Sequence, residues 1–247
     1  MLLKHKTAVI TGCNRGIGKS MLNIFSENGA NIIACVRDSN QEFQNEIKEI
    51  EKKNKNSISI ESFDFSNEKE SKEAGTRINL QNKKIDILIN NAGTINTSLF
   101  QMTPIEKFKE IFQINFFSQI VFSQQIIKNM IKNKSGSIIY ISSTSGIEGN
   151  EGRSAYSSSK AAIISKVNVL SKELGVFNIR VNAIAPGLTN TRMMSENTST
   201  EKIKDVVKNL SLKRFAEPNE IGKTALFLSS ELSSYITGQT IRVDGGM

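Results

Sequence analysis

The chain has 247 residues, the size of one large α/β domain or two small ones, and its formal net charge is +8. The lysines are spread along expected helices and mixed with glutamates, as in residues 46–53, which indicates a solvated surface and no nucleic-acid partner. Cys13, Cys35 and a single histidine predict reduced thiols and no metal site, and the absence of an apolar targeting or membrane-length run predicts a cytoplasmic protein without a membrane partner.

Short apolar, strand-like runs alternate with amphipathic, helix-like stretches along the whole chain. The strand-like runs are residues 6–11, 31–36, 57–63, 85–90, 136–142, 179–184 and 239–243. The helix-like stretches lie near 16–28, 39–54, 67–81, 104–132, 154–175 and 218–230. This alternation predicts a single α/β domain over residues 1–247, with a doubly wound parallel sheet of about seven strands and helices on both faces.

A glycine-rich turn, Thr11-Gly12-Cys13-Asn14-Arg15-Gly16-Ile17-Gly18, follows the first strand-like run and leads into a helical pattern. In such a turn Gly12 lets the chain reverse sharply, Gly16 lets the backbone approach phosphates, and Gly18 lets helix and strand pack closely. The helix N-terminus attracts negative charge. The turn therefore predicts a dinucleotide site, and a merely flexible turn is the alternative.

The fourth strand-like run ends in Asn90-Asn91-Ala92-Gly93. At the end of a parallel strand, these amides can hydrogen-bond a neighbouring loop, and the small residues leave room for a cofactor. A strand-to-loop turn built on asparagine side chains is the alternative interpretation.

Tyr156 and Lys160 are four residues apart, so a helix would place them on one face. An ammonium beside a phenol stabilises the phenolate and lowers the phenol pKa, which is about 10 in a free tyrosine. Tyr156 would then be a usable proton donor near neutral pH. Ser143, thirteen positions upstream, offers a second hydroxyl that could bind the carbonyl group to which Tyr156 would donate its proton. Taken alone, the pair also fits the surface of an amphipathic helix.

In this order and spacing, these segments resemble the short-chain dehydrogenase/reductase family over essentially the whole chain. Pro186-Gly187 and Gly238-Gln239-Thr240…Asp244-Gly245-Gly246 also match. The resemblance implies a Rossmann fold and an NAD(P)-dependent oxidoreductase acting on CH–OH and C=O groups. Within the family, the closing segment and the length look most like the 3-oxoacyl-[acyl-carrier-protein] reductases of fatty acid biosynthesis, although sugar, steroid and polyol dehydrogenases share the pattern.

The resemblance implies roles for four residues in carbonyl reduction. Tyr156 would donate the proton, Ser143 would orient the carbonyl oxygen, and Lys160 would tune Tyr156 and reach the nicotinamide ribose. Asn115 would hold a water that extends the proton relay. The serines at positions 142 and 145 compete for the role of Ser143, which the thirteen-residue spacing of the family selects.

The resemblance also indicates the cofactor. NAD-preferring relatives carry an aspartate where this chain has Val36, and here Arg37 follows and Arg15 lies in the glycine-rich turn. Two guanidiniums suit recognition of a 2′-phosphate, although Asp38 could neutralise Arg37. We expect NADP (NADPH). The expected cofactor-binding residues are Gly12, Asn14, Arg15, Gly16, Ile17, Gly18, Arg37, Asp64, Phe65, Asn91, Ala92, Gly93, Tyr156, Lys160, Pro186, Gly187, Thr189 and Thr191.

The remaining expectations concern substrate and assembly. The polar segment near 190–214 would form a substrate lid, with a plain surface helix as the alternative. An acidic carrier protein needs basic docking residues: Lys132 and Lys134 match one expected position, but the other is Phe177. A small alcohol or ketone, such as a sugar, is the alternative substrate, and a non-catalytic nucleotide-binding relative is a third possibility. The helices near 104–132 and 154–175 are apolar nearly all round, which predicts that a second subunit covers them. The resemblance implies a homotetramer.

Overall fold

Seven parallel strands form one sheet in the order β3-β2-β1-β4-β5-β6-β7, as expected from the sequence. The computed structural model describes residues 1–247, except for the side chains of residues 200 and 202. The strands are β1 (Thr7–Thr11), β2 (Asn31–Val36), β3 (Ile58–Ser62), β4 (Ile87–Asn90), β5 (Gly136–Ile141), β6 (Ile179–Pro186) and β7 (Thr240–Val243). The strand order reverses between β1 and β4, and in open α/β sheets ligands bind at that point.

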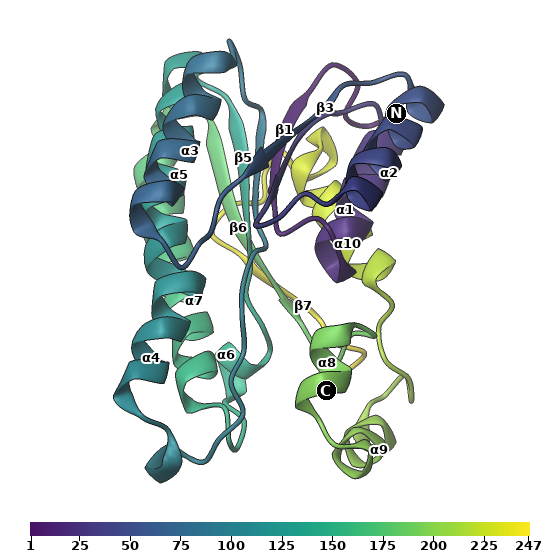
Figure 1. Cartoon of the computed structure of the whole chain (residues 1–247), viewed down its shortest axis with the longest axis vertical. Coiled ribbons are helices and arrows are strands. Elements are labelled where there is room, and N and C mark those ends of the chain that lie inside the picture. The colour runs from purple at the N-terminus through teal and green to yellow at the C-terminus, as the bar shows by residue number, and fades with distance from the viewer.

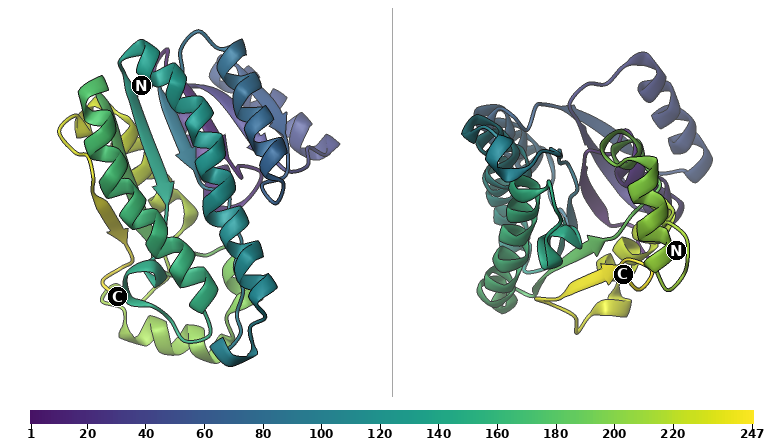
Figure 2. Two further views of the ribbon diagram at one scale, coloured as in Figure 1. Left: turned by 90° about the vertical axis from the view of Figure 1, so that its left-hand side faces the viewer. Right: turned by 90° about the horizontal axis from the view of Figure 1, so that it is seen from below.

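Helices cover both faces of the sheet, which explains why the strands are almost continuously apolar. One face carries α1 (Gly16–Glu27), α2 (Gln41–Asn54) and α10 (Pro218–Ser229), and the other carries α3 (Glu68–Gln81), α5 (Ser118–Asn133) and α7 (Ser154–Leu174) (Figure 1). Figure 2 shows α3, α5 and α7 side by side on the second face.

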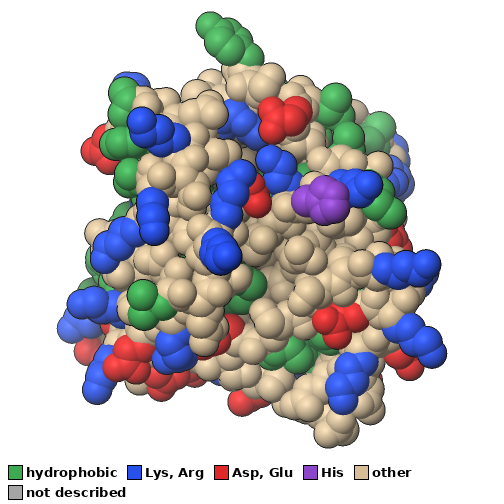
Figure 3. Space-filling model, turned by 90° about the horizontal axis from the view of Figure 1, so that it is seen from above, with side chains coloured by type: hydrophobic (Ala, Val, Ile, Leu, Met, Phe, Trp, Pro, Cys, Tyr) green, Lys and Arg blue, Asp and Glu red, His purple; other side chains and the backbone are tan. Residues whose placement is uncertain are grey.

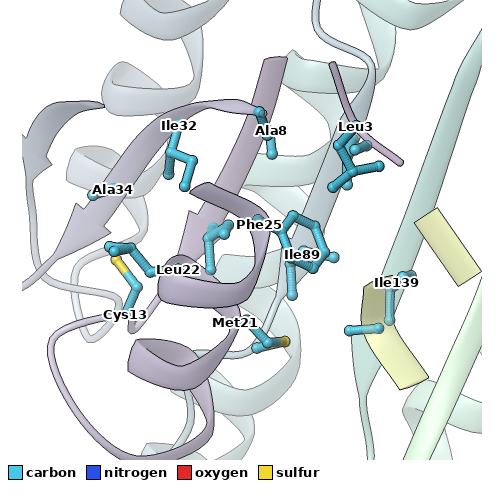
Figure 4. Close-up of a cluster of buried hydrophobic side chains, with 14 of the residues drawn as sticks. Leu3, Ala8, Cys13, Met21, Leu22, Phe25, Ile32, Ala34, Ile89 and Ile139 are labelled. Atoms are coloured by element: carbon cyan, nitrogen blue, oxygen red, sulfur yellow. The ribbon is translucent and has the colours of Figure 1, made fainter. Parts of the chain in front are cut away.

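Each strand sends alternate side chains into two cores. In β1, Ala8 and Ile10 join the cluster under α1, whereas Val9 joins the cluster under α5 and α7. Figure 4 shows the first cluster, where Leu22 and Phe25 of α1 pack against the sheet. These two cores fix where each strand ends, and therefore where the residues that follow the strands lie.

The helix expected near 104–132 is divided by a π-helical turn. It consists of α4 (Ile105–Phe112), the turn η2 (Gln113–Phe117) and α5. A π-helical turn inserts one residue into the helical ladder and is frequent at functional sites. Asn115 lies in this turn and is fully buried. No glycine or proline within 105–133 marks the turn in the sequence.

Shorter elements lie at and beyond the carboxyl ends of the strands. They include α6 (Ser145–Glu148), α8 (Arg192–Asn197) and α9 (Thr200–Asn209), at the lower end of Figure 1. The opposite end, in Figure 3, carries Lys and Arg side chains scattered among Asp and Glu. In the described part of the chain, no helix is long and apolar enough to cross a membrane.

Candidate active site

A cleft of about 570 Å³ opens at the carboxyl ends of the strands. Every residue that the sequence predicted for the site lines this cleft, with the exception of Asn115. The lining residues from the predicted set are Gly12, Asn14, Arg15, Gly16, Ile17, Gly18, Arg37, Asp64, Phe65, Asn91, Ala92, Gly93, Ser143, Tyr156, Lys160, Pro186, Gly187, Thr189 and Thr191. The fold therefore gathers segments that are up to 179 positions apart, from Gly12 to Thr191, around one space.

The glycine-rich turn is held against the end of β4. The side-chain amide of Asn91 donates to the carbonyl oxygens of Thr11 and Gly12, at 2.9 and 3.0 Å. Thr11 Oγ1 accepts from the backbone N–H groups of Asn91 and Ala92. Gly12 has φ +67°, and a Cβ there would lie 2.9 Å from Ala92 Cα. The turn thus needs glycine both for its conformation and for its close approach to β4.

The start of α1 offers backbone donors to an anion. Arg15 is the N-cap residue, and its side chain makes no capping hydrogen bond in the described structure. The first N–H groups of a helix have no partner within the helix, and the helix dipole favours a negative charge there. With the glycine cradle beside it, this helix start fits a pyrophosphate.

Gly18→Ala is expected to damage the site, because its Cβ would lie only 2.0 Å from the Gly12 carbonyl oxygen. Relieving that overlap requires a backbone shift, so we expect a loss of about 1–3 kcal/mol in the free energy of unfolding and weaker dinucleotide binding. Gly175→Ala is the matched control, since a Cβ there meets nothing within 4 Å. Thermal unfolding and cofactor titration measure both effects, and equal behaviour of the two variants would contradict this account.

Ser143, Tyr156 and Lys160 converge at one end of the cleft. Ser143 follows β5, whereas Tyr156 and Lys160 lie one turn apart in α7, and all three are buried. Ser143 and Tyr156 share a hydrogen bond. Lys160 Nζ donates to the Ile141 carbonyl oxygen at 2.8 Å and lies 5.7 Å from the centroid of the Tyr156 ring. A phenol, a hydroxyl and an ammonium thus lie close together in a largely buried part of the cleft.

The two competing serines have other partners. Ser142 Oγ donates to the Lys160 carbonyl oxygen at 2.9 Å, and Ser145 Oγ hydrogen-bonds the side chain of Asn150. Of the three serines, Ser143 is the one whose hydroxyl meets Tyr156. The geometry therefore favours Ser143, as the thirteen-residue spacing did.

Comparison with known proteins finds relatives over essentially the whole chain. A family described as "Enoyl-(Acyl carrier protein) reductase" matches residues 12–247. The whole chain is 37% identical to "3-oxoacyl-[acyl-carrier-protein] reductase FabG" of Chlamydia trachomatis, of which it covers 98%. It is 34% identical over its whole length to the protein of the same name in Thermotoga maritima, of which it covers 99%.

The chain belongs to the short-chain dehydrogenase/reductase family.

Solved structures of the family have the same fold. A short-chain type dehydrogenase/reductase from Mycobacterium ulcerans superposes with a TM-score of 0.92 at 26% identity, covering 100% of this chain and 90% of that one. A protein described as an NAD(P)-dependent gluconate 5-dehydrogenase, from Beutenbergia cavernae, was solved with bound NADP at low occupancy. It gives a TM-score of 0.91 at 26% identity, with coverages of 99% and 97%. As a member of this family, the protein is an NAD(P)-dependent oxidoreductase.

Tyr156 differs in one respect from the sequence-based expectation. Burial raises the pKa of Tyr156, while the hydrogen bond with Ser143 and the charge of Arg153 act in the opposite direction. The Lys160 ammonium lies 5.7 Å from the centroid of the Tyr156 ring and donates to the Ile141 carbonyl oxygen. Burial lowers the pKa of Lys160 itself to about 8. In this short-chain dehydrogenase/reductase, Tyr156 therefore retains its proton at neutral pH.

Asn115 lies behind the cleft, beside Lys160. Its side-chain amide donates to the Thr94 carbonyl oxygen and to Ser159 Oγ, and its Oδ1 accepts from the Thr94 N–H at 2.8 Å. A Cβ on Gly93 would lie 3.1 Å from Asn115 Oδ1 and 3.5 Å from Lys160 Nζ. The side chain of Asn115 thus joins the loop after β4 to α7. This structural role was not part of the expectation that Asn115 binds a water.

Arg153 was missed by the sequence analysis. It lines the cleft three residues before Tyr156, and its Nη2 donates to the Asn197 carbonyl oxygen at 2.8 Å and to Thr198 Oγ1 at 3.1 Å. It therefore joins the end of α8 to the start of α7. An arginine before a helix has no recognisable sequence pattern, because its partners lie 44 and 45 positions away.

Proposed function

We propose that this short-chain dehydrogenase/reductase reduces a 3-oxoacyl thioester carried on acyl carrier protein, with NADPH as the reductant. The observation that carries the chemistry is the convergence of Ser143, Tyr156 and Lys160 in the cleft that the glycine-rich turn also lines. The substrate assignment draws on the full-length likeness to reductases that bear that name.

The residues of the cleft fit a nicotinamide dinucleotide. The glycine cradle and the start of α1 would hold the pyrophosphate, and Pro186, Gly187, Thr189 and Thr191 would cover the nicotinamide end. Once bound, the nicotinamide supplies the hydride that the carbonyl carbon receives.

Arg15 and Arg37 support NADPH over NADH. Both are exposed and line the same part of the cleft. Arg37 Nε lies 3.4 Å from Asp38 Oδ2, so the neutralisation that the sequence suggested is present. Because the two side chains are 72% and 85% exposed, this ion pair is weak and a 2′-phosphate can replace it.

Side chains of the cleft position the carbonyl oxygen and supply its proton. Ser143 donates a hydrogen bond to the carbonyl oxygen and orients it, and Tyr156 transfers its proton to that oxygen as negative charge develops. The raised pKa of Tyr156 keeps the phenol protonated before the reaction, which is the form that a reduction requires. The positive charges of Lys160 and Arg153 stabilise the phenolate that remains.

The segment near 190–214 would close over the substrate. Met193 and Met194 of α8 line the cleft, and Thr191 caps that helix by accepting from the Met194 N–H. Arg153 hydrogen-bonds the end of α8, so the proposed lid is joined to the start of the helix that carries Tyr156 and Lys160. The side chains of residues 200 and 202, inside this proposed lid, lie outside the described structure.

Carrier docking is expected at one basic position. Lys132 and Lys134 are exposed at the end of α5, whereas Phe177, at the other expected position, packs against the core. We expect the double variant Lys132→Glu/Lys134→Glu to raise KM for the carrier-bound substrate by about tenfold, with kcat/KM unchanged for a small thioester. Lys48→Glu/Lys52→Glu, on the opposite face, is the charge-matched control. Equal KM values for the carrier-bound substrate in the two double variants would show that the carrier protein does not dock at Lys132 and Lys134.

A substrate panel tests the proposed function. NADPH oxidation is followed with a carrier-bound 3-oxoacyl thioester, with small ketones including keto sugars, and without substrate. A preference for small ketones would favour the second candidate, which the structural likeness to proteins described as gluconate dehydrogenases supports. No oxidation with any carbonyl would indicate a non-catalytic relative.

We also propose a homotetramer. Phe100, Met102, Ile105 and Phe117 are 47–71% exposed on the elements around α4, and Val169 of α7 is 50% exposed. Covering such a surface with a second subunit removes apolar area from water. Light scattering at micromolar concentration should give four times the mass of one chain, and Phe117→Glu should reduce it. A stable, active monomer would contradict the assembly and leave the chemistry untouched.

A further inference from the structure

One cation of the cleft has no carboxylate partner although it is partly removed from water. Arg153, the N-cap residue of α7, lines the cleft, is half-buried and forms no ion pair within the described residues. A buried or partly buried charge is usually paired, because the loss of its hydration is costly. An unpaired guanidinium in a ligand cleft therefore indicates that the ligand supplies the missing acceptor.

The other cations that line the cleft differ from Arg153. Arg15 and Arg37 lie where the 2′-phosphate is proposed to bind, and Lys160 is buried and donates to a backbone carbonyl. Arg192 is paired with a glutamate of its own helix, and its side chain is 71% exposed. Among the described cleft residues, Arg153 is thus the cation with neither a proposed cofactor contact nor a carboxylate.

Part of the Arg153 guanidinium has no protein partner. Its Nη2 donates to the Asn197 carbonyl oxygen and to Thr198 Oγ1, whereas Nε and Nη1 donate to no group in the described structure. The two bonds to the end of α8 hold the planar group in place. A fixed guanidinium with unused donors suits an oxygen acceptor, and the positive charge strengthens such a hydrogen bond.

The position of Arg153 beside Tyr156 suits the second oxygen of the proposed substrate. Arg153 stands three residues before Tyr156, and both side chains line the cleft. A 3-oxoacyl thioester has two carbonyl oxygens, one on the reacting carbon and one on the thioester carbon two carbons away. With the first oxygen at Ser143 and Tyr156, the second needs a donor close to Tyr156. A simple ketone has no oxygen for this place.

We propose that Arg153 is a specificity residue that donates to the thioester carbonyl oxygen of a 3-oxoacyl substrate, and so selects carbonyl compounds with a second oxygen acceptor two carbons from the reacting carbon. This inference rests on the proposed function. The thioester oxygen itself does not react: the hydride goes to the ketone carbon, and the proton of Tyr156 goes to the ketone oxygen.

Two substrates that differ by one oxygen test this contact. The first is the N-acetylcysteamine thioester of 3-oxobutanoate, and the second is the thioether ketone in which CH₂ replaces the thioester carbonyl. Arg153→Met removes the donors and keeps a similar stem. We expect kcat/KM for NADPH-dependent reduction to fall by about tenfold or more with the thioester, beyond any fall with the thioether ketone. Each ratio compares two enzymes on one substrate, so the different reactivities of the ketones cancel.

Matched variants separate this contact from the other effects of Arg153. Loss of a positive charge near Tyr156, or of the bonds to α8, should lower the turnover of both substrates by the same factor. Thr198→Val removes one acceptor at α8 and should leave the ratio between the substrates unchanged. Arg192→Met removes a cleft arginine that is already paired, and should also leave this ratio unchanged. Arg153→Lys keeps the charge without the planar fork, so it should keep part of the selectivity.

A binding measurement independent of turnover completes the test. Each ketone is titrated into protein loaded with NADP⁺, which has no hydride to deliver. Arg153→Met should weaken the binding of the thioester by about tenfold or more, and that of the thioether ketone by less than about twofold. Equal losses for the two ketones, in turnover or in binding, would overturn the inference and leave the proposed reduction intact. Failure of the proposed function appears differently, as no NADPH oxidation by wild type with the thioester, and the binding measurement then still decides whether Arg153 contacts the second oxygen.

Discussion

Tyr156→Phe is expected to lower kcat for carbonyl reduction by about 10²- to 10⁴-fold, the usual contribution of a positioned general acid. The change removes one hydroxyl and leaves the ring, so the affinity for NADPH should change by less than about twofold. The Ser143 hydroxyl would remain to orient the carbonyl, but no group would supply the proton. Tyr235→Phe is the matched control, because Tyr235 is fully exposed and far along the chain from the cleft residues of α7.

The companion variant Lys160→Ala should affect both steps, because Lys160 has two proposed roles. We expect a loss of kcat and, in addition, weaker binding of NADPH in a fluorescence titration. A Tyr156→Phe enzyme with near-normal turnover would show that the proton comes from another group, and the proposed roles in the cleft would have to be reassigned.

Removing Arg37 is expected to shift cofactor preference from NADPH toward NADH. Each charge-assisted hydrogen bond to the 2′-phosphate is worth about 1.5–3 kcal/mol, which is roughly ten- to a hundredfold in kcat/KM. Arg37→Ala and Arg15→Ala should each lose that factor with NADPH and little with NADH. The NADPH/NADH ratio within one variant corrects for general damage to the enzyme.

Two further variants sharpen this prediction. Arg37→Lys keeps the charge but not the planar fork, so it should retain part of the preference. Asp38→Asn removes the carboxylate that competes for Arg37, so it should strengthen the preference. A wild-type enzyme that favours NADH would show that neither arginine recognises a phosphate.

The parts of the site that follow local patterns were predictable. The glycine-rich turn from Gly12 to Gly18 can be recognised in the sequence, because each glycine is required locally by its backbone conformation or by a close contact. The strand boundaries were predicted to within two residues at each end, since buried parallel strands are marked by continuous apolar runs. Because these strands end together, the residues after them could be expected to meet.

What depends on distant partners was not predictable. The π-helical turn at Gln113–Phe117 depends on packing that no local residue signals. The pKa of Tyr156 is set first by burial, which spacing in a helix does not reveal, and the charge of Arg153, which the sequence did not point to, acts on it too.

The most direct measurement of the central claim follows the hydride itself. Purified protein is incubated with a 3-oxoacyl thioester and NADPH that carries deuterium at both C4 positions, and the product is analysed by mass spectrometry. The account predicts a 3-hydroxyacyl thioester with one deuterium on the hydroxyl-bearing carbon, formed by wild type and the Tyr235→Phe control and nearly absent with Tyr156→Phe. A 3-hydroxyacyl product without deuterium, or an equal amount of labelled product from the Tyr156→Phe variant, would contradict it.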